Sequence, residues 1–235
     1  MERTEARATA ASRLLLAYDR VRDRPPLDRL ANALAKPLLL YNAQVSGNCY
    51  KARLLLAHLG VDYERREIDV IERSGRSDLL GDLNPALQVP TLVLDDGRPL
   101  AESNAILWYL GLGTSYLPDD DFDRAKVLQW MFFEQYSHEP NIAVVRYWMS
   151  IAADRPRDSV IEARRNAGYE ALDAMERELA EREFLVADRY TIADIALYAY
   201  THVAGDGGFD LSRYPGLGRW LDRVATQSGH VQITA

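Results

Sequence analysis

Residues 37–60, PLLLYNAQVSGNCYKARLLLAHLG, contain the pattern that decides the first half of the fold. The apolar run Leu38–Tyr41 predicts a buried strand, and the apolar spacing from Ala52 to Leu59 predicts a helix. Gly60 is expected to end this helix, because glycine adopts the left-handed cap conformation without a steric cost. The polar turn between strand and helix therefore lies at a helix N-terminus, where free backbone N–H groups and the helix dipole favour an anion.

Further short elements follow this strand and helix. Tyr63–Val70 predicts a strand of mixed polarity, as at a sheet edge, and the polar stretch after it predicts a loop with a short helix. Asp95-Asp96-Gly97 lies between two short apolar runs, which is typical of a β-hairpin. A helix is expected to begin at Glu102-Ser103. The order β-α-β-α-β-β-α predicts a closed α+β domain over residues 37–113.

The rest of the chain has helical spacing. In residues 119–235 a long helix is expected to begin at Phe122 and to be interrupted by Pro140. The segment Thr191–Asp194 carries the capping-box pattern of a helix start. These residues therefore predict an all-α helical-bundle domain. Residues 1–36 are expected to form a separate N-terminal helical extension.

Composition narrows the class of protein. The 235 residues are 48% hydrophobic, which is enough for two modest domains with full cores. A net charge of −7 argues against a nucleic-acid partner, and the apolar runs are too short for a membrane helix. Cys49 is the only cysteine, which excludes an internal disulfide and favours a reducing, cytoplasmic location. The four histidines show no metal-ligand spacing, so no metal is expected.

Two dipeptides of the first domain could hold a ligand. Val89-Pro90 stands before a predicted strand, where a cis bond would leave the Val89 main chain open to pair with a peptide-like ligand. Glu102-Ser103 stands at a helix start, where the Ser103 hydroxyl could hold a carboxylate and Glu102 an ammonium group. The plain alternatives are an ordinary turn proline and ordinary helix capping.

Three blocks of sequence carry a resemblance to a known family. They are LYNAQVSGNCYKARLLL (residues 40–56), NPALQVPTLVLDDGRPLAESNAILWYL (84–110) and FLVADRYTIADIALYAY (184–200). In the order and spacing of these blocks the chain resembles the cytosolic glutathione transferases over residues 38–226. The resemblance implies a thioredoxin-like N-terminal domain, a helical C-terminal domain and a homodimer.

The resemblance also implies glutathione as cosubstrate and assigns contacts to it. Val89, before a cis Pro90, would pair its main chain with the cysteinyl unit, and Gln88 would assist nearby. Glu102 and Ser103 would hold the ammonium and carboxylate of the γ-glutamyl unit. The glycyl carboxylate would lie near Arg73 or Arg76, although no clear motif survives there.

Ser46 is the first candidate for activating the glutathione thiol. Its position resembles that of the catalytic serine in theta- and zeta-like classes, and its hydroxyl would donate a hydrogen bond to the thiolate. Lowering a thiol pKa of about 8.5 by about two units requires about 2.7 kcal/mol. A charge-assisted hydrogen bond contributes about 1.5–3 kcal/mol and the helix end about 0.3–1 kcal/mol, so the two suffice.

Three other residues remain candidates for the thiol chemistry. Asn48 could donate its amide to the sulfur. Cys49 could form a mixed disulfide with glutathione, but a small buried hydrophobic residue is the better interpretation. Tyr41 ends the first strand, as the catalytic tyrosine does in alpha-, mu- and pi-like classes, although a core or rim position fits it better.

The resulting hypothesis is a transferase that conjugates the glutathione thiolate to a small apolar electrophile. The alternatives are a glutathione-dependent disulfide reductase or peroxidase, and a non-catalytic interaction module with the same fold. Lys51 and Arg53 are expected to be solvated or paired on the first helix. A further group of residues could line a pocket for the electrophile, but residues at helical spacing more often take core or interface positions: Tyr136, His138, Arg146, Tyr147 and Trp148.

Overall fold

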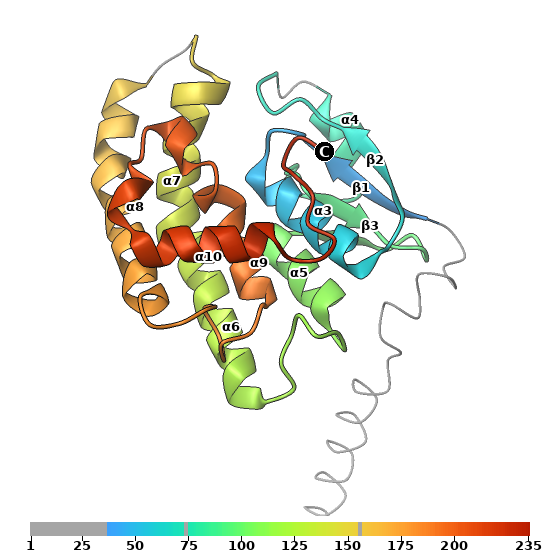
Figure 1. Ribbon diagram of the computed structural model, residues 1–235. Coiled ribbons are helices and arrows are strands. Elements are labelled where there is room, and N and C mark those ends of the chain that lie inside the picture. Colours follow the sequence, from blue (N-terminus) through green and yellow to red (C-terminus); the bar gives the residue numbers. More distant parts are fainter. Residues whose placement is uncertain (1–36, 73–74, 155–156) are drawn as a thin grey trace, which may run out of the picture.

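A computed structural model describes residues 37–72, 75–154 and 157–235, and shows an α+β domain followed by a helical domain (Figure 1). The predicted order β-α-β-α-β-β-α is confirmed for the first domain, and the predicted extension over residues 1–36 lies outside the described residues. The elements of the first domain are β1 Leu38–Asn42, α3 Gly47–Leu59, β2 Tyr63–Glu67, α4 Arg76–Leu80, β3 Thr91–Val93, β4 Pro99–Ala101 and α5 Ser103–Gly111.

The sheet has the strand order β2-β1-β3-β4. β1 runs parallel to β2 and antiparallel to β3, and the predicted hairpin joins β3 to β4. Side chains alternate along β1, as a strand requires. Leu38 and Leu40 pack into the main core with α3 and α5, whereas Tyr41 packs on Leu80 of α4 in a smaller cluster. The sheet is therefore covered by α3 and α5 on one face and by α4 on the other.

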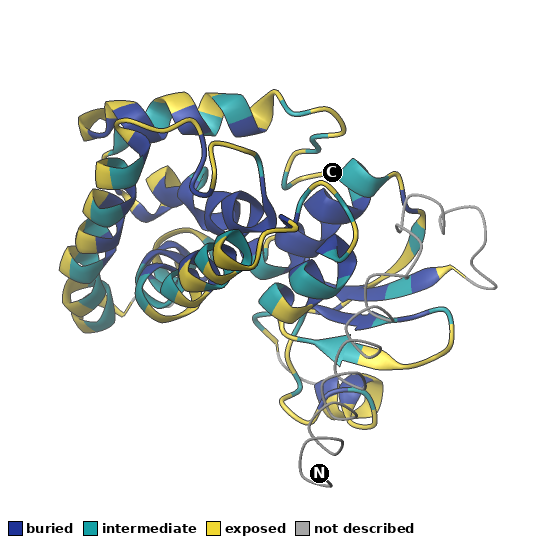
Figure 2. Cartoon of the chain, turned by 90° about the horizontal axis from the view of Figure 1, so that it is seen from below, coloured by how far each residue is buried: buried dark blue, intermediate teal, exposed yellow. Residues whose placement is uncertain are grey.

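The second domain is a helical bundle around a buried central helix. Its helices are α6 Asp121–Phe133, α7 Glu139–Arg146, α8 Asp158–Leu179, α9 Ile192–Thr201 and α10 Pro215–Ala225, with two short 3-10 turns at Ala204–Gly207 and Leu211–Arg213. Every residue of α9 is buried (Figure 2). The capping box predicted at Thr191–Asp194 is present, and Asp194 Oδ1 also accepts from Trp220 Nε1 at 2.9 Å. One continuous apolar core joins α9 to α3 and α5.

The sequence predicted that Pro140 interrupts the long helix, and this prediction is wrong. The helical path continues from α6 through a π-turn at Glu134–His138 into α7, and through a second π-turn at Tyr147–Ile151. In the first π-turn the Glu139 N–H bonds to the Glu134 carbonyl, five residues back. Pro140 then falls in the first positions of α7, where a missing N–H breaks no intrahelical bond. The wider turn therefore accommodates the proline.

The C-terminal segment after α10 returns across the first domain beside α3 (Figure 1). The Tyr50 hydroxyl donates to the Val231 carbonyl at 2.7 Å, and Arg53 Nη2 donates to the Ile233 carbonyl at 2.6 Å. Arg65 Nη1 donates to the carbonyl of Ala235 at 2.8 Å. The central helix of the second domain, α9, and this tail thus both contact the helix that follows β1.

Candidate active site between the two domains

The loop from β1 to α3 is held by side chains from both domains. The Gln44 N–H donates to Glu67 Oε2 at 3.1 Å, and its carbonyl accepts from Arg53 Nη2 at 3.1 Å. The Val45 carbonyl accepts from Arg146 Nη1 of α7 at 2.9 Å. Most polar groups of this short loop are therefore fixed, and the loop delivers Ser46 in a defined position.

Ser46 is the N-cap residue of α3. Its Oγ accepts from the Cys49 N–H at 3.3 Å, so the predicted capping role is present. A hydroxyl that accepts one hydrogen bond keeps its own proton available for donation. The side chain is half-buried and lines a cleft between the domains. Ser46 can therefore cap the helix and donate to a ligand at the same time.

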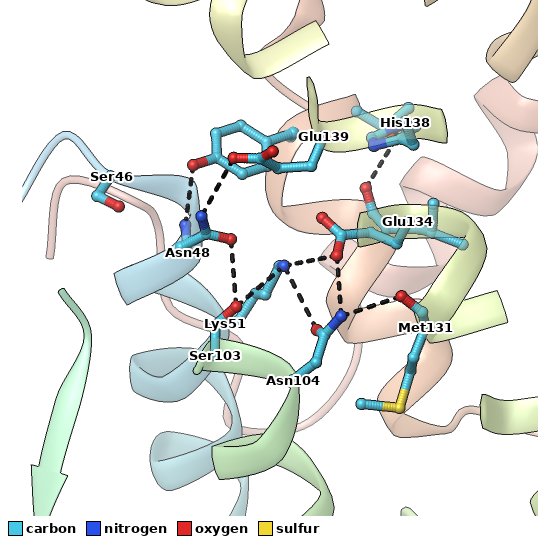
Figure 3. A network of polar contacts seen from close by, with 12 residues as sticks. Ser46, Asn48, Lys51, Ser103, Asn104, Met131, Glu134, His138 and Glu139 are labelled. Carbon is cyan, nitrogen blue, oxygen red and sulfur yellow. Dashed lines mark hydrogen bonds and ion pairs between the residues drawn. The ribbon is translucent and has the colours of Figure 1, made fainter. Parts of the chain in front are cut away.

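Asn48 connects the two domains two residues further along (Figure 3). Its Nδ2 lies 3.3 Å from Glu139 Oε1 at the start of α7, and its Oδ1 accepts from the Ser103 hydroxyl at 3.2 Å. Its main-chain N–H donates to the Tyr200 hydroxyl of α9 at 3.2 Å. The Asn48 Nδ2 group carries two protons, so one remains for a ligand in the cleft.

Cys49 and Tyr41 lie away from this cleft. Cys49 is fully buried, and its Sγ accepts from the Ala43 N–H at 3.3 Å. Burial raises the pKa of the Cys49 thiol to about 11, against the opposing hydrogen bond with Ser46. Tyr41 packs in the cluster beneath α4, and its hydroxyl accepts from Arg66 Nη1 at 3.3 Å. The thiol is therefore poorly placed for nucleophilic chemistry in the native protein.

The segment before β3 presents an open main chain to the same cleft. The Val89–Pro90 peptide bond is cis, as the family resemblance implied. The Gln88 carbonyl accepts from Asn84 Nδ2 and from the Thr91 hydroxyl, both at 3.0 Å, which fixes the approach to the strand. Within the described part of the chain, the Val89 N–H and C=O have no hydrogen-bond partner. An extended ligand could therefore pair with the main chain of this segment, which leads into β3.

Glu102 and Ser103 begin α5 beneath Asn48. Glu102 is exposed and has φ of 68°, a backbone conformation that residues other than glycine rarely adopt. Ser103 is buried, and its hydroxyl lies between Asn48 Oδ1 and Lys51 Nζ, each at 3.2 Å. A non-glycine residue held in such a conformation is typical of functional sites.

A buried ion pair supports these residues from below. Lys51 Nζ lies 2.8 Å from Glu134 Oε2, and both side chains are fully buried. Asn104 joins the network through a bond from its Nδ2 to the same carboxylate oxygen at 3.0 Å (Figure 3). Lys51 is thus paired rather than solvated. Arg53, which is also buried, is held by Asn42 Oδ1 at 2.7 Å and by main-chain carbonyls.

The cleft has a volume of about 680 Å³ and lies between the first domain and α7. It brings together five of the residues singled out from the sequence as thiol-activating or glutathione-binding: Ser46, Asn48, Arg76, Gln88 and Val89. The outer wall is largely apolar or aromatic: Val70, Ile71, Ala143, Val144, Tyr147, Trp148 and Ile151. One end can therefore serve polar ligand groups and the other an apolar group.

The electrophile-pocket candidates separate into two groups. Arg146, Tyr147 and Trp148 line the cleft. Tyr136 is 87% exposed on the outside, and His138 is buried with its Nε2 2.8 Å from the Thr201 hydroxyl. Burial lowers the pKa of His138 to about 3, with a smaller effect from the nearby Lys51 charge. Tyr136 therefore belongs to the surface and His138 to the core.

Sequence reasoning missed Glu139 and Tyr200, which line the cleft opposite Ser46. Glu139 precedes Pro140 and Tyr200 ends the third block of resemblance, but neither position carries a motif that marks a site. Arg76 lines the cleft while donating to the carbonyls of Asp69 and Leu87, and Arg73 lies outside the described residues. Among the residues described, no acidic, histidine or cysteine side chains cluster as a metal site would require, and no helix could span a membrane.

Comparisons with known proteins agree with this geometry. Family models for the "Glutathione S-transferase, N-terminal domain" and the "Glutathione S-transferase, C-terminal domain" match residues 45–111 and 136–228. A glutathione S-transferase structure from Pseudomonas fluorescens is 45% identical, with a TM-score of 0.81, over 85% of this chain and 100% of that one.

Two further relatives are more distant. Glutathione S-transferase D7 of Anopheles gambiae is 31% identical over 82% of this chain and 88% of that protein. A glutathione transferase homologue from Lodderomyces elongisporus, solved with two glutathione molecules per subunit, is 26% identical with a TM-score of 0.73, over 83% of this chain and 95% of that one. The fold, the cleft and these matches together show that the chain belongs to the glutathione S-transferase family.

Proposed function

We propose that this protein is a glutathione transferase that conjugates the glutathione thiolate to a small apolar electrophile. The observation that carries the proposal is the convergence of Ser46, Asn48 and the Val89 main chain on one cleft. The first two are hydrogen-bond donors at a helix N-terminus, and the third is a main-chain segment whose N–H and C=O are open for pairing. This is the set of groups that an anionic sulfur within a peptide requires.

In this proposal glutathione lies as an added strand along Val89, with Gln88 and the cis Pro90 shaping the edge. Its γ-glutamyl end reaches the start of α5, where Glu102 takes the ammonium and Ser103 the carboxylate. Ser103 donates to Asn48 in the free protein, so binding turns this hydroxyl toward the ligand. The solved homologue that holds glutathione supports the choice of ligand.

Ser46 stabilises the thiolate by donating its hydroxyl proton, and Asn48 adds an amide N–H. Proximity to the electrophile and ionisation of the thiol then supply the rate enhancement. The buried Cys49 does not favour the disulfide reductase alternative, because its thiol neither lines the cleft nor ionises near neutral pH. The open cleft and the donor set likewise favour an enzyme over a non-catalytic module.

The test is a glutathione titration of the wild type, Ser46→Ala and Asn48→Ala, with the bound thiolate followed by its ultraviolet absorbance over a pH series. Loss of one charge-assisted hydrogen bond should raise the bound thiol pKa by about 1–2 units in Ser46→Ala. Ser115→Ala, an exposed serine outside the cleft, is the matched control. Absence of glutathione binding at millimolar concentration would reject the function, and an unchanged thiol pKa in Ser46→Ala would reject its mechanism.

We also propose a cytoplasmic homodimer. Three aromatic side chains on α6 and the π-turn after it are exposed by about 70% or more: Phe122, Phe132 and Tyr136. Large exposed apolar side chains gathered on one element are typical of an interface. Phe132→Ser should yield a monomer in analytical ultracentrifugation, whereas a wild type that sediments as a monomer would reject the dimer.

The cytoplasmic location is supported by the cysteine content. The single cysteine, Cys49, is buried and unpaired, which fits a reducing compartment.

A further inference from the structure

The tail, residues 228–235 after α10, is anchored along α3 (Figure 1). His58 Nδ1 lies 2.8 Å from the Ser228 carbonyl oxygen, and the Tyr50 hydroxyl donates to the Val231 carbonyl at 2.7 Å. Both contacts are with main-chain carbonyls, so they depend on the path of the tail and not on its side chains. The path of the tail is therefore fixed by the helix that begins at the candidate active site.

Gly229 lets the tail approach α3 closely. Its φ of 76° is in the left-handed region that favours glycine. A Cβ at this position would lie 3.1 Å from the Ala57 carbonyl oxygen and 3.2 Å from the His58 Cα. Val231 and Ile233 pack, partly buried, against the apolar core beyond it. A larger residue at position 229 would therefore push the tail away from α3.

Gln44 binds the far end of the tail to the loop between β1 and α3. Gln44 Nε2 donates to the Ile233 carbonyl at 2.7 Å and to the Ala235 carbonyl at 3.0 Å. A side-chain amide has two protons, so the tail accepts both of them. Arg53 Nη2 donates to the same Ile233 carbonyl at 2.6 Å and to the Gln44 carbonyl at 3.1 Å. Tail and loop are thus joined twice.

Gln44 lies inside the turn that places Ser46. The Ser46 N–H donates to the Ala43 carbonyl at 3.0 Å, which closes a β-turn with Gln44 and Val45 at its centre. The Val45 carbonyl is held from the other side by Arg146 Nη1 at 2.9 Å. The dihedral angles of the two central residues set the position of the residue that follows them. A movement of Gln44 therefore moves the Ser46 hydroxyl.

We propose that the tail is a positioning element of the active site and that Gln44 is the positioning residue through which it acts on Ser46. The proposal rests on the function proposed above, because it concerns the bond from Ser46 to the glutathione thiolate. Neither Gln44 nor any residue of the tail lines the cleft. A functional group must lie within about 0.5 Å of its productive position to act fully. The bonds from Gln44 to the tail restrict the loop to that position.

The first experiment compares the wild type with Gln44→Met, which keeps the length of the side chain but has no donor. The bound thiol pKa is read from the thiolate absorbance over a pH series, and kcat is measured with a nitro-substituted aryl chloride. The thiol pKa should rise by about 1 unit, and kcat below that pKa should fall about 10-fold, because the Ser46 hydroxyl is displaced. KM for glutathione should change less than about 2-fold, since Gln44 does not touch the ligand. Gln232→Met, at an exposed glutamine of the tail, is the matched control and should behave as the wild type.

Double variants separate positioning from general damage. Because Gln44→Met acts through Ser46, it should change the thiol pKa by less than about 0.2 unit in a Ser46→Ala background. Gly229→Val pushes the tail from α3 and should raise the thiol pKa as Gln44→Met does, although Gly229 lies outside the cleft. Gln44→Met combined with Gly229→Val should match the single variants rather than their sum.

The outcomes that overturn the proposal are distinct from failure of the proposed function. An unchanged thiol pKa in Gln44→Met, additive effects of Gln44→Met and Ser46→Ala, or a folded Gly229→Val protein with the wild-type thiol pKa would each overturn it. Urea denaturation shows whether Gly229→Val is folded, and if it is not, the cycle of Gln44 and Ser46 decides alone. Failure of the wild type to bind glutathione rejects the function itself, whereas a thiol pKa that rises only in Ser46→Ala rejects only the role of the tail.

Discussion

The ammonium group of Lys51 on α3 lies 2.8 Å from the carboxylate of Glu134, and neither side chain reaches solvent. The two residues belong to different domains, and the Ser103 hydroxyl lies 3.2 Å from the same ammonium. The ion pair therefore holds the start of α5 against the helical domain. It is the buried support of the surface on which we place the γ-glutamyl end of glutathione.

Removing one partner of this pair should destabilise the protein strongly. Lys51→Met leaves Glu134 as a buried, unpaired carboxylate, which costs about 3–5 kcal/mol of unfolding free energy. Urea denaturation measures the loss. Arg98→Ala at the exposed Arg98–Asp96 pair is the control and should leave the midpoint unchanged. A Lys51→Met protein as stable as the wild type would show that the pair contributes nothing.

Arg53 should control the order of the loop that carries Ser46. Arg53→Met removes the donors to the buried Asn42 Oδ1 and to the part-buried carbonyls of Gln44 and Ile233, and leaving the buried acceptor unpaired costs about 1–3 kcal/mol. Amide hydrogen exchange of the loop peptides should become faster, and exchange of α8 should not. Arg219→Ala, which removes an exposed arginine, serves as the control. Unchanged exchange in the loop would contradict this role.

Cys49 should be inert toward thiol reagents until the protein unfolds. The pKa of the Cys49 thiol is about 11 in the folded protein, against an ordinary thiol pKa of 9.0. The stability contributed by this thiol is therefore full below about pH 9 and is lost as the pH rises toward 11. Labelling with a chromogenic disulfide in the presence and absence of urea measures the reactivity. Rapid labelling of the native protein at neutral pH would refute the inference.

His138 should make the protein sensitive to acid. Its pKa is about 3 in the folded state, against an ordinary histidine pKa of 6.5. Such a group contributes stability above pH 6.5, and that stability is lost as the pH falls toward 3, because the unfolded chain binds the proton first. The unfolding free energy should fall by about 1.4 kcal/mol per pH unit in this window. His138→Gln should flatten the slope, and an equally steep slope in that variant would assign the sensitivity elsewhere.

The sequence predicted the fold well because its signals are local. The continuous apolar run of β1, the Gly60 cap and the Thr191–Asp194 capping box each depend on neighbours within a few positions. Pro140 was misjudged because the sequence does not show that a π-turn precedes it. The helical register around a proline depends on packing with α8 and α9, which no local pattern records.

Only part of the candidate site could be predicted from the sequence. The residues at the N-terminus of α3 and before β3 stand in recognisable turns, so Ser46, Asn48 and Val89 could be named. Glu139 and Tyr200 belong to the helices α7 and α9, where a polar residue that faces a cleft looks in the sequence like one that faces solvent. Their place depends on how the two domains meet through Lys51 and Glu134, a contact between positions 83 residues apart (134 − 51).

The returning tail has a practical consequence for handling the protein. Ala235 lies against Gln44 and Arg65, beside the loop that precedes Ser46. A purification tag or fluorescent fusion attached after Ala235 would have to leave the surface at that point, and it would pull on the contacts that keep the loop in place. Immobilisation through a surface site away from these contacts avoids this disturbance, so sensors and affinity columns built from this protein should not be anchored at Ala235.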